Sequence, residues 1–253
     1  MHMLNADQWA RFERDGYLSL GRVLDDGELA ALQQRIDDIM LGRASIDYAR
    51  IMMQLDSTTG DIADAGPQTK GHKGATLAYR KIQDLELDPL FLACMRKPLF
   101  RHICEKIYGS RVPVASFRAM FMNKPREHGT PLAWHQDRWT DLDRDPLVTI
   151  WIALDPATVE NGCVQVIPGS HHSLVNPEDS SGFLRADQIA ALLATQRPVH
   201  LEVPAGEAVL LHNWTLHASE VNRTPIARRA FSVCYMDART QSRRGAAFPV
   251  IFE

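Results

Sequence analysis

The chain has 253 residues, of which 45% are hydrophobic, and a formal net charge of −3 at pH 7. This is enough for one large domain with a hydrophobic core, and the slight acidic excess argues against nucleic-acid binding. The sequence has no apolar run long enough to cross a membrane, and its first ten residues lack the order of a secretory signal. We therefore expect a cytoplasmic protein with no nucleic-acid or membrane partner.

The N-terminal third is predicted to be mostly helical. A capped helix should precede a short strand at residues 17–20, and apolar residues at steps of three and four predict a helix from residue 25 or 26 to about 42. A second helical pattern covers residues 88–109, with Pro98 as a potential kink. Residues 44–76 contain Gly, Ser, Thr and Asp with weak periodicity, which predicts a long mobile lid loop.

The rest of the chain has a β-rich texture. Helices followed by short strands, without β-α-β alternation, predict a mainly β fold: a double-sheet barrel or jelly roll with the N-terminal helices packed outside. We treat residues 1–253 as one domain, with residues 1–110 as its helical part and 111–253 as the jelly-roll core. Strands are expected at 112–122, 148–154, 163–167, 200–203, 208–212 and 230–236, with a helix at 186–195.

The first candidate for chemistry is the pair His135 and Asp137, which flank Gln136. On a strand, residues i and i+2 share one face, so an imidazole and a carboxylate at this spacing can bind the same metal ion. About one such pair is expected by chance in a chain of this composition, so the pair needs support from elsewhere.

His217 provides that support. If the turn at residues 222–225 closes an antiparallel hairpin, His217 lies opposite Arg228 and shares its face with Ser219. The hairpin would place a metal ligand beside a guanidinium that binds an anion. Arg229 is the rival for this role, but its side chain should point to the opposite face.

Two histidines and one carboxylate leave three positions of an octahedral ion open, as in non-haem Fe(II) oxygenases. A structural zinc site would need four protein ligands, and the four cysteines are scattered without a C-x-x-C pair. Two alternatives stay open on the residues alone. One is a zinc hydrolase on the same barrel, and the other is a cupin-like protein that binds a metal or ligand without turnover.

Further segments, in this order, resemble the phytanoyl-CoA dioxygenase family of Fe(II)- and 2-oxoglutarate-dependent oxygenases. In chain order they lie at residues 12–18, 81–84 (K-x-Q-D), 123–125, 134–137 (W-H-Q-D), 151, 161–163, 167–171, 217–219, 222–224 and 228. The resemblance implies a double-stranded β-helix with Fe(II) on His135, Asp137 and His217. It also implies that 2-oxoglutarate binds Arg228 and Ser219, with Lys81 and Trp151 as further co-substrate contacts.

By the same resemblance the protein is expected to be a dioxygenase that uses dioxygen and 2-oxoglutarate to hydroxylate a small-molecule metabolite, releasing succinate and CO2. Arg138 and Trp139, directly after the metal pair, are our candidates for substrate contact, together with the loop at residues 44–76. The absence of a Lys/Arg-rich stretch favours a small metabolite over a coenzyme A ester. The substrate's identity, hydroxylation against desaturation, and the oligomeric state stay open.

Overall fold

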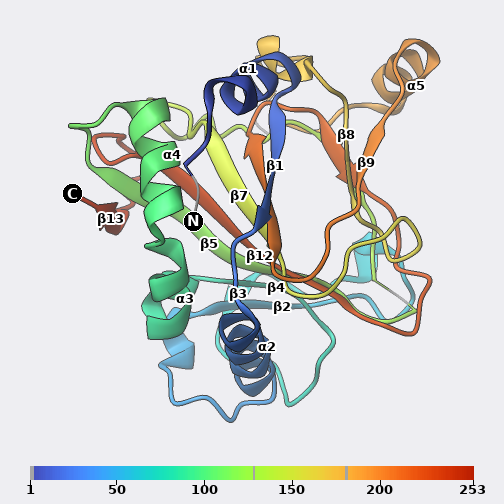
Figure 1. The fold of residues 1–253 in the computed structure, drawn as a ribbon. Helices are drawn as coiled ribbons and strands as arrows, with labels where there is room; N and C mark the ends of the chain where they lie inside the picture. Colours follow the sequence, from blue (N-terminus) through green and yellow to red (C-terminus); the bar gives the residue numbers. More distant parts are fainter. Residues whose placement is uncertain (1–2, 128, 180–181) are drawn as a thin grey trace.

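Two antiparallel sheets form the centre of the protein in the computed structural model, which describes residues 3–127, 129–179 and 182–253 (Figure 1). The larger sheet has the order β1 (Tyr17–Arg22), β10 (Glu207–His212), β7 (Val148–Ala153), β12 (Arg228–Asp237), β5 (Val114–Lys124), β4 (Tyr79–Gln83), β2 (Met52–Leu55) and β3 (Thr69–Lys70), and β13 (Val250–Phe252) also pairs with β5. The smaller sheet has the order β6 (Leu132–His135), β11 (His217–Ser219), β8 (Val164–Val166) and β9 (Val199–Leu201).

The helices lie on the outside of the sheets (Figure 1). They are α1 (Ala6–Asp15), α2 (Asp26–Met40), α3 (Pro89–Met95), α4 (Pro98–Tyr108) and α5 (Ala186–Thr195). Capping boxes start α1 at Asn5 and α2 at Asp25, where each side chain accepts a hydrogen bond from a backbone N–H of the first turn. Over the described ranges, the helices are too short or too polar to span a membrane.

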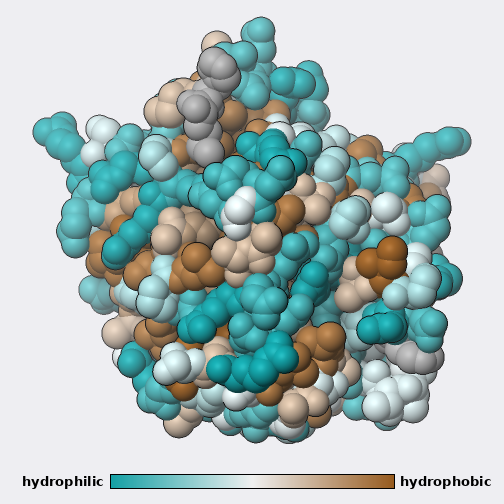
Figure 2. All heavy atoms as spheres, turned by 60° about the horizontal axis from the view of Figure 1, so that its bottom comes forward, coloured by the Kyte–Doolittle hydropathy of each residue, from teal (hydrophilic) through white to brown (hydrophobic). Residues whose placement is uncertain are grey.

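The main hydrophobic core lies between the outer face of the larger sheet and the helices. Ile150 and Ile152 of β7 and Phe231 of β12 are fully buried there, in one cluster with Ile36 of α2 and Phe100 of α4. Alternate residues of the same strands point to the inner face, so the sheet separates this core from the space inside the barrel. On the molecular face shown in Figure 2, hydrophilic side chains predominate and hydrophobic ones are scattered among them.

The predicted jelly-roll architecture is confirmed, and the helix expected at residues 186–195 has those bounds. The helical pattern at 88–109 is two helices, because Pro98 starts α4 instead of kinking one longer helix. The prediction that residues 44–76 form a loop without regular structure is wrong. This segment contains β2 and β3, and Met52 and Met53 of β2 are buried. The four glycines of this segment all follow β2 in the sequence, so they do not interrupt its apolar residues.

The predicted hairpin is also wrong. His217 in β11 pairs with His135 and Val166 in the smaller sheet, whereas Arg228 in β12 pairs with Lys124 in the larger one. The connection between the two strands crosses from one sheet to the other. Buried Asn222 anchors this crossing by donating hydrogen bonds to the carbonyls of Lys124, Pro125 and Ile226.

Candidate active site

A cavity of about 370 Å³ lies inside the barrel, with walls from both sheets. Although the hairpin was wrong, His217 and Arg228 both line this cavity, from opposite sheets. The structure brings together all nine residues that the sequence singled out, namely Lys81, His135, Asp137, Arg138, Trp139, Trp151, His217, Ser219 and Arg228.

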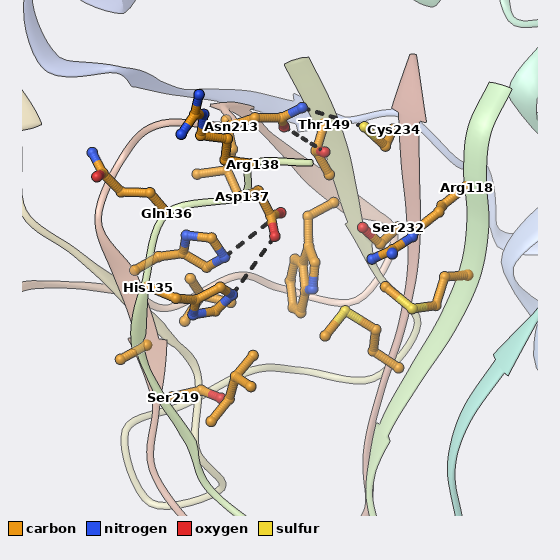
Figure 3. A pocket seen from close by; sticks show the side chains of 18 of the residues that line it. Arg118, His135, Gln136, Asp137, Arg138, Thr149, Asn213, Ser219, Ser232 and Cys234 are labelled. Atoms are coloured by element: carbon orange, nitrogen blue, oxygen red, sulfur yellow. Dashed lines mark hydrogen bonds and ion pairs between the residues drawn. The ribbon is translucent and has the colours of Figure 1, made fainter. Parts of the chain in front are cut away.

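His135 of β6 and His217 of β11 are paired neighbours in the smaller sheet, and Asp137 follows just after β6. Figure 3 shows the Asp137 carboxylate beside His135. The Nε2 atoms of His135 and His217 lie 3.7 and 3.9 Å from the two carboxylate oxygens of Asp137. Ligand atoms that each bind one ion at about 2 Å lie at comparable separations from one another. Across residues 3–127, 129–179 and 182–253, these three form the only cluster of three or more His, Cys, Asp or Glu side chains that could share an ion.

Backbone carbonyls determine which ring nitrogen of each histidine donates a hydrogen bond. His135 Nδ1 donates to the carbonyl of Ala133 at 2.8 Å, and His217 Nδ1 donates to the carbonyl of Thr215 at 2.9 Å. Because Nδ1 carries the proton in each ring, the Nε2 lone pair faces Asp137 and is free to bind a metal. Burial, together with the neighbouring His217, lowers the pKa of His135 to about 4, so this ring is neutral at pH 7. The donor set fits a divalent transition metal.

Hydrogen bonds from the backbone and from neighbouring side chains hold the segment around His135 and Asp137. The side chain of Gln136 points away from the Asp137 carboxylate (Figure 3) and donates to the carbonyls of Ser173 and Trp214. The N–H of Asp137 donates to the carbonyl of Asn213 at 2.7 Å. Asn213 accepts in turn from the hydroxyl of Thr149. These bonds fix the carboxylate of Asp137 beyond the end of β6.

Arg228 is a buried cation without a counter-ion among the described residues. It is 2% exposed, and its Nε and Nη1 atoms have no hydrogen-bond partner there. Its guanidinium lies 5.5 Å from the centre of the Trp151 ring. Burial lowers its pKa to about 10, so it stays charged at pH 7. A buried guanidinium with unpaired donors is costly, and a carboxylate in the cavity would satisfy them.

Two further predicted residues lie near Arg228. Ser219 is buried, and together with Lys81 it lines both the main cavity and a small extension that reaches Lys124. Burial, with the neighbouring charges of Arg80 and Arg118, lowers the pKa of Lys81 to about 8. This end of the cavity is therefore strongly cationic and suits an acidic ligand.

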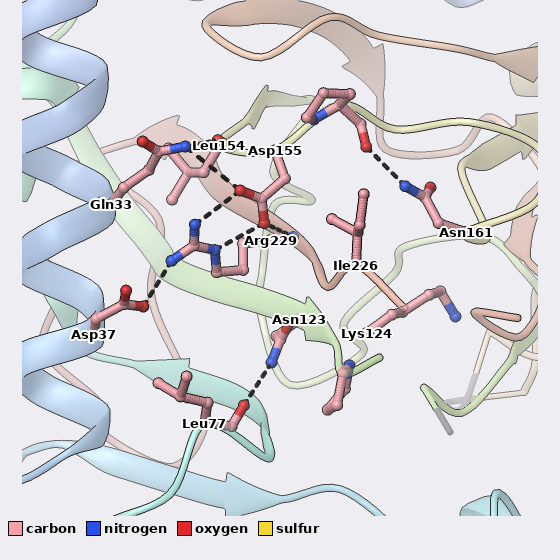
Figure 4. A network of polar contacts seen from close by, with 12 residues as sticks. Gln33, Asp37, Leu77, Asn123, Lys124, Leu154, Asp155, Asn161, Ile226 and Arg229 are labelled. Carbon is pink, nitrogen blue, oxygen red and sulfur yellow. Dashed lines mark hydrogen bonds and ion pairs between the residues drawn. The ribbon is translucent and has the colours of Figure 1, made fainter. Parts of the chain in front are cut away.

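Arg229 lies on the outer face of β12, as expected from strand alternation (Figure 4). Its Nε and Nη2 atoms donate to both carboxylate oxygens of Asp155 at 2.7 and 2.8 Å. Its Nη1 donates to Asp37 of α2 at 2.6 Å. Arg229 is thus fully engaged in binding the helix to the sheet, and the rival placement inside the cavity is excluded.

The substrate candidates line the cavity on the Asp137 side. Arg138 donates to the carbonyl of Pro177, and its Nε lies 3.8 Å from a carboxylate oxygen of Asp145. The ring of Trp139 lies 4.5 Å from that of Phe117. Gln68, in the expected lid segment, also reaches the cavity.

Sequence reasoning missed several lining residues, above all Arg118 and Asn213. Strand alternation could have identified Arg118, because it shares a face of the predicted strand with Met120 and Met122, which also line the cavity. Asn213 had no such signal, since it lies in the turn after β10.

The chain is similar in sequence and in fold to known proteins. The model of the family described as phytanoyl-CoA dioxygenase (PhyH) matches residues 12–230. A probable phytanoyl-CoA dioxygenase of Caenorhabditis elegans is 27% identical over 245 residues, covering 92% of this chain and 75% of that protein. The L-proline trans-4-hydroxylase of Streptomyces griseoviridis is 28% identical over 253 residues, covering 90% and 85%. Among solved structures, EctD from S. alaskensis with 2-oxoglutarate and 5-hydroxyectoine has a TM-score of 0.74 at 20% identity, covering 94% of this chain and 78% of that one.

Proposed function

Because the chain belongs to the phytanoyl-CoA dioxygenase family of Fe(II)- and 2-oxoglutarate-dependent oxygenases, we propose that it hydroxylates a small-molecule metabolite with release of succinate and CO2. The observation that carries this proposal is Arg228, a buried guanidinium whose Nε and Nη1 have no partner among the described residues, in the same cavity as a two-histidine, one-carboxylate cluster. A zinc hydrolase has no required use for this cation, whereas a keto diacid co-substrate has two carboxylates.

In this proposal His135, Asp137 and His217 hold Fe(II), and Arg228 and Ser219 bind the distal carboxylate of 2-oxoglutarate. Lys81 and Trp151 form the walls around the co-substrate. Bound iron and 2-oxoglutarate would supply the oxidation of a substrate C–H bond, with dioxygen as the oxidant. The protein's own part is to orient the two organic molecules and to keep bulk water from the cavity.

Cavity size favours a small substrate. Ligand pockets commonly measure about 300–1,000 Å³. At about 370 Å³, the cavity has room for 2-oxoglutarate and one small molecule, and not for an enclosed coenzyme A ester. Arg138 and Trp139 line it beside Asp137, which supports their role in substrate contact. The similarity to a proline hydroxylase further supports hydroxylation of a small metabolite.

The test is spectroscopic and anaerobic. Adding Fe(II) and then 2-oxoglutarate to the metal-free protein should produce the weak visible metal-to-ligand charge-transfer band of a chelated keto acid. The Arg228→Ala variant should need far more 2-oxoglutarate for the same band. Arg223→Ala, which removes a nearby exposed arginine, is the matched control and should behave like the parent protein.

Two results would contradict the proposal. Bound iron without a band would favour a metal-binding protein that does not turn over. Stoichiometric zinc in the isolated protein, with no response to 2-oxoglutarate, would favour a hydrolase.

A further inference from the structure

Arg118 is a second guanidinium on the inner face of the larger sheet. It lines the cavity from β5 and faces the space opposite His135 (Figure 3). In the register of β5 and β12, Arg118 of β5 lies opposite Cys234 of β12. Arg228 lies six residues before Cys234 on β12 and is opposite Lys124 of β5. At about 3.3 Å per residue, the backbones of the two arginines are roughly 20 Å apart along the strand. They therefore serve different parts of the cavity.

Aromatic rings hold the Arg118 side chain in place. Its guanidinium carbon lies 5.0 Å from the centre of the Trp139 ring and 4.9 Å from that of Phe117. Such contacts orient a guanidinium without neutralising it. In the part of the chain that the structure describes, no carboxylate lies within ion-pair distance of Arg118 and no acceptor receives a hydrogen bond from it.

The charges in the cavity single out Arg118. A divalent metal would be balanced by Asp137 and one carboxylate of 2-oxoglutarate, and the other carboxylate would be balanced by Arg228. Arg138 already has Asp145 nearby. Lys81, with a pKa of about 8, can shed its charge by losing a proton. Arg118 has no carboxylate partner among the described residues, so its charge would stay without a partner once the co-substrate is bound.

We propose that Arg118 binds a carboxylate of the primary substrate and that the substrate is therefore a small carboxylic acid. This inference rests on the proposed function. One guanidinium matches the single charge and planar shape of a carboxylate, whereas a phosphate carries more charge and calls for more donors. Met120 and Trp139, beside Arg118, offer apolar surface to the carbon skeleton of the acid.

The test uses matched pairs of small carboxylic acids and their primary amides as probes, drawn from amino acids, N-acyl amino acids and aryl acids. Each probe is added anaerobically to the protein loaded with Fe(II) and 2-oxoglutarate, and binding is read as a shift of the charge-transfer band. The same titrations are run on Arg118→Gln, on Arg118→Lys and on Arg111→Gln, which removes an exposed arginine near the start of β5.

We expect acids, and not their amides, to shift the band. Arg118→Gln should weaken acid binding by roughly 10- to 100-fold, the usual effect of losing a charge-assisted contact. Arg118→Lys should recover part of this loss, and Arg111→Gln should match the parent protein. The charge-transfer band that Fe(II) and 2-oxoglutarate produce before any probe is added tests the proposed function separately. A band that forms but does not shift would therefore count against the carboxylic acid substrate alone.

Three outcomes would overturn the inference. The first is that amides bind as well as acids, and the second is that no acid in the panel shifts the band; either result would argue against a carboxylic acid substrate. If Arg118→Gln instead weakened 2-oxoglutarate binding, Arg118 would belong to the co-substrate site.

Discussion

Replacing Arg228 with Met should make the metal-free, ligand-free protein more stable while removing its affinity for 2-oxoglutarate. The guanidinium buries Nε and Nη1 without partners among the described residues. Each unsatisfied donor costs about 1–3 kcal/mol. The contact with Trp151 offsets about 1–2 kcal/mol of this cost. For two donors this leaves a net cost of up to about 5 kcal/mol, so an apolar side chain of similar length should raise the free energy of unfolding by about 2–3 kcal/mol.

Thermal unfolding followed by circular dichroism measures the effect. For a chain of this size, each kcal/mol corresponds to roughly 2–4 °C in the melting temperature. Without ligand, the Arg228→Met variant should melt higher than the parent protein. With Fe(II) and 2-oxoglutarate under anaerobic conditions, the order should reverse, because only the parent gains stability from the bound co-substrate. A ligand-free variant that melts lower than the parent would refute the view that this cation lacks a partner.

Three further predictions address other parts of the molecule. Arg229→Met should lower the free energy of unfolding by about 3 kcal/mol, because it leaves the buried carboxylate of Asp155 without its partner; an unchanged urea midpoint would contradict this. Burial raises the pKa of Glu86 from 4.5 to about 7. Between these two pH values the folded protein holds a proton that the unfolded chain has lost, so the free energy of unfolding falls as the pH rises from 4.5 to about 7. Glu86→Gln should remove this fall and stabilise the protein at pH 8 by up to about 3 kcal/mol, with little change at pH 4.5, as urea titrations at the two pH values would reveal. Asp137→Ala should abolish stoichiometric Fe(II) binding in equilibrium dialysis while the far-ultraviolet circular dichroism spectrum stays unchanged; retained iron would remove Asp137 from the ligand set.

Local patterns in the sequence predicted which residues face the cavity better than they predicted which strands are neighbours. The spacing of His135 and Asp137 suggested a shared ion, and alternation assigned Arg228 and Arg229 to opposite faces. The same alternation could not say that β11 and β12 belong to different sheets, because a turn signal does not reveal whether the chain folds back or crosses over. Strand β2 escaped notice because its stability comes from pairing with β4, which is distant in the sequence.

Because Arg228 and Arg229 are adjacent, the register of β12 determines which of the two side chains faces the cavity and which faces the outer side of the sheet. A slip of this strand by one residue would exchange the two side chains, turning Arg229 inward and leaving Asp155 and Asp37 unpaired. The outer ion pairs therefore penalise every register except the one that points Arg228 into the cavity. Changes in α2 at Asp37 could in this way alter anion recognition inside the barrel without touching a single residue that lines it.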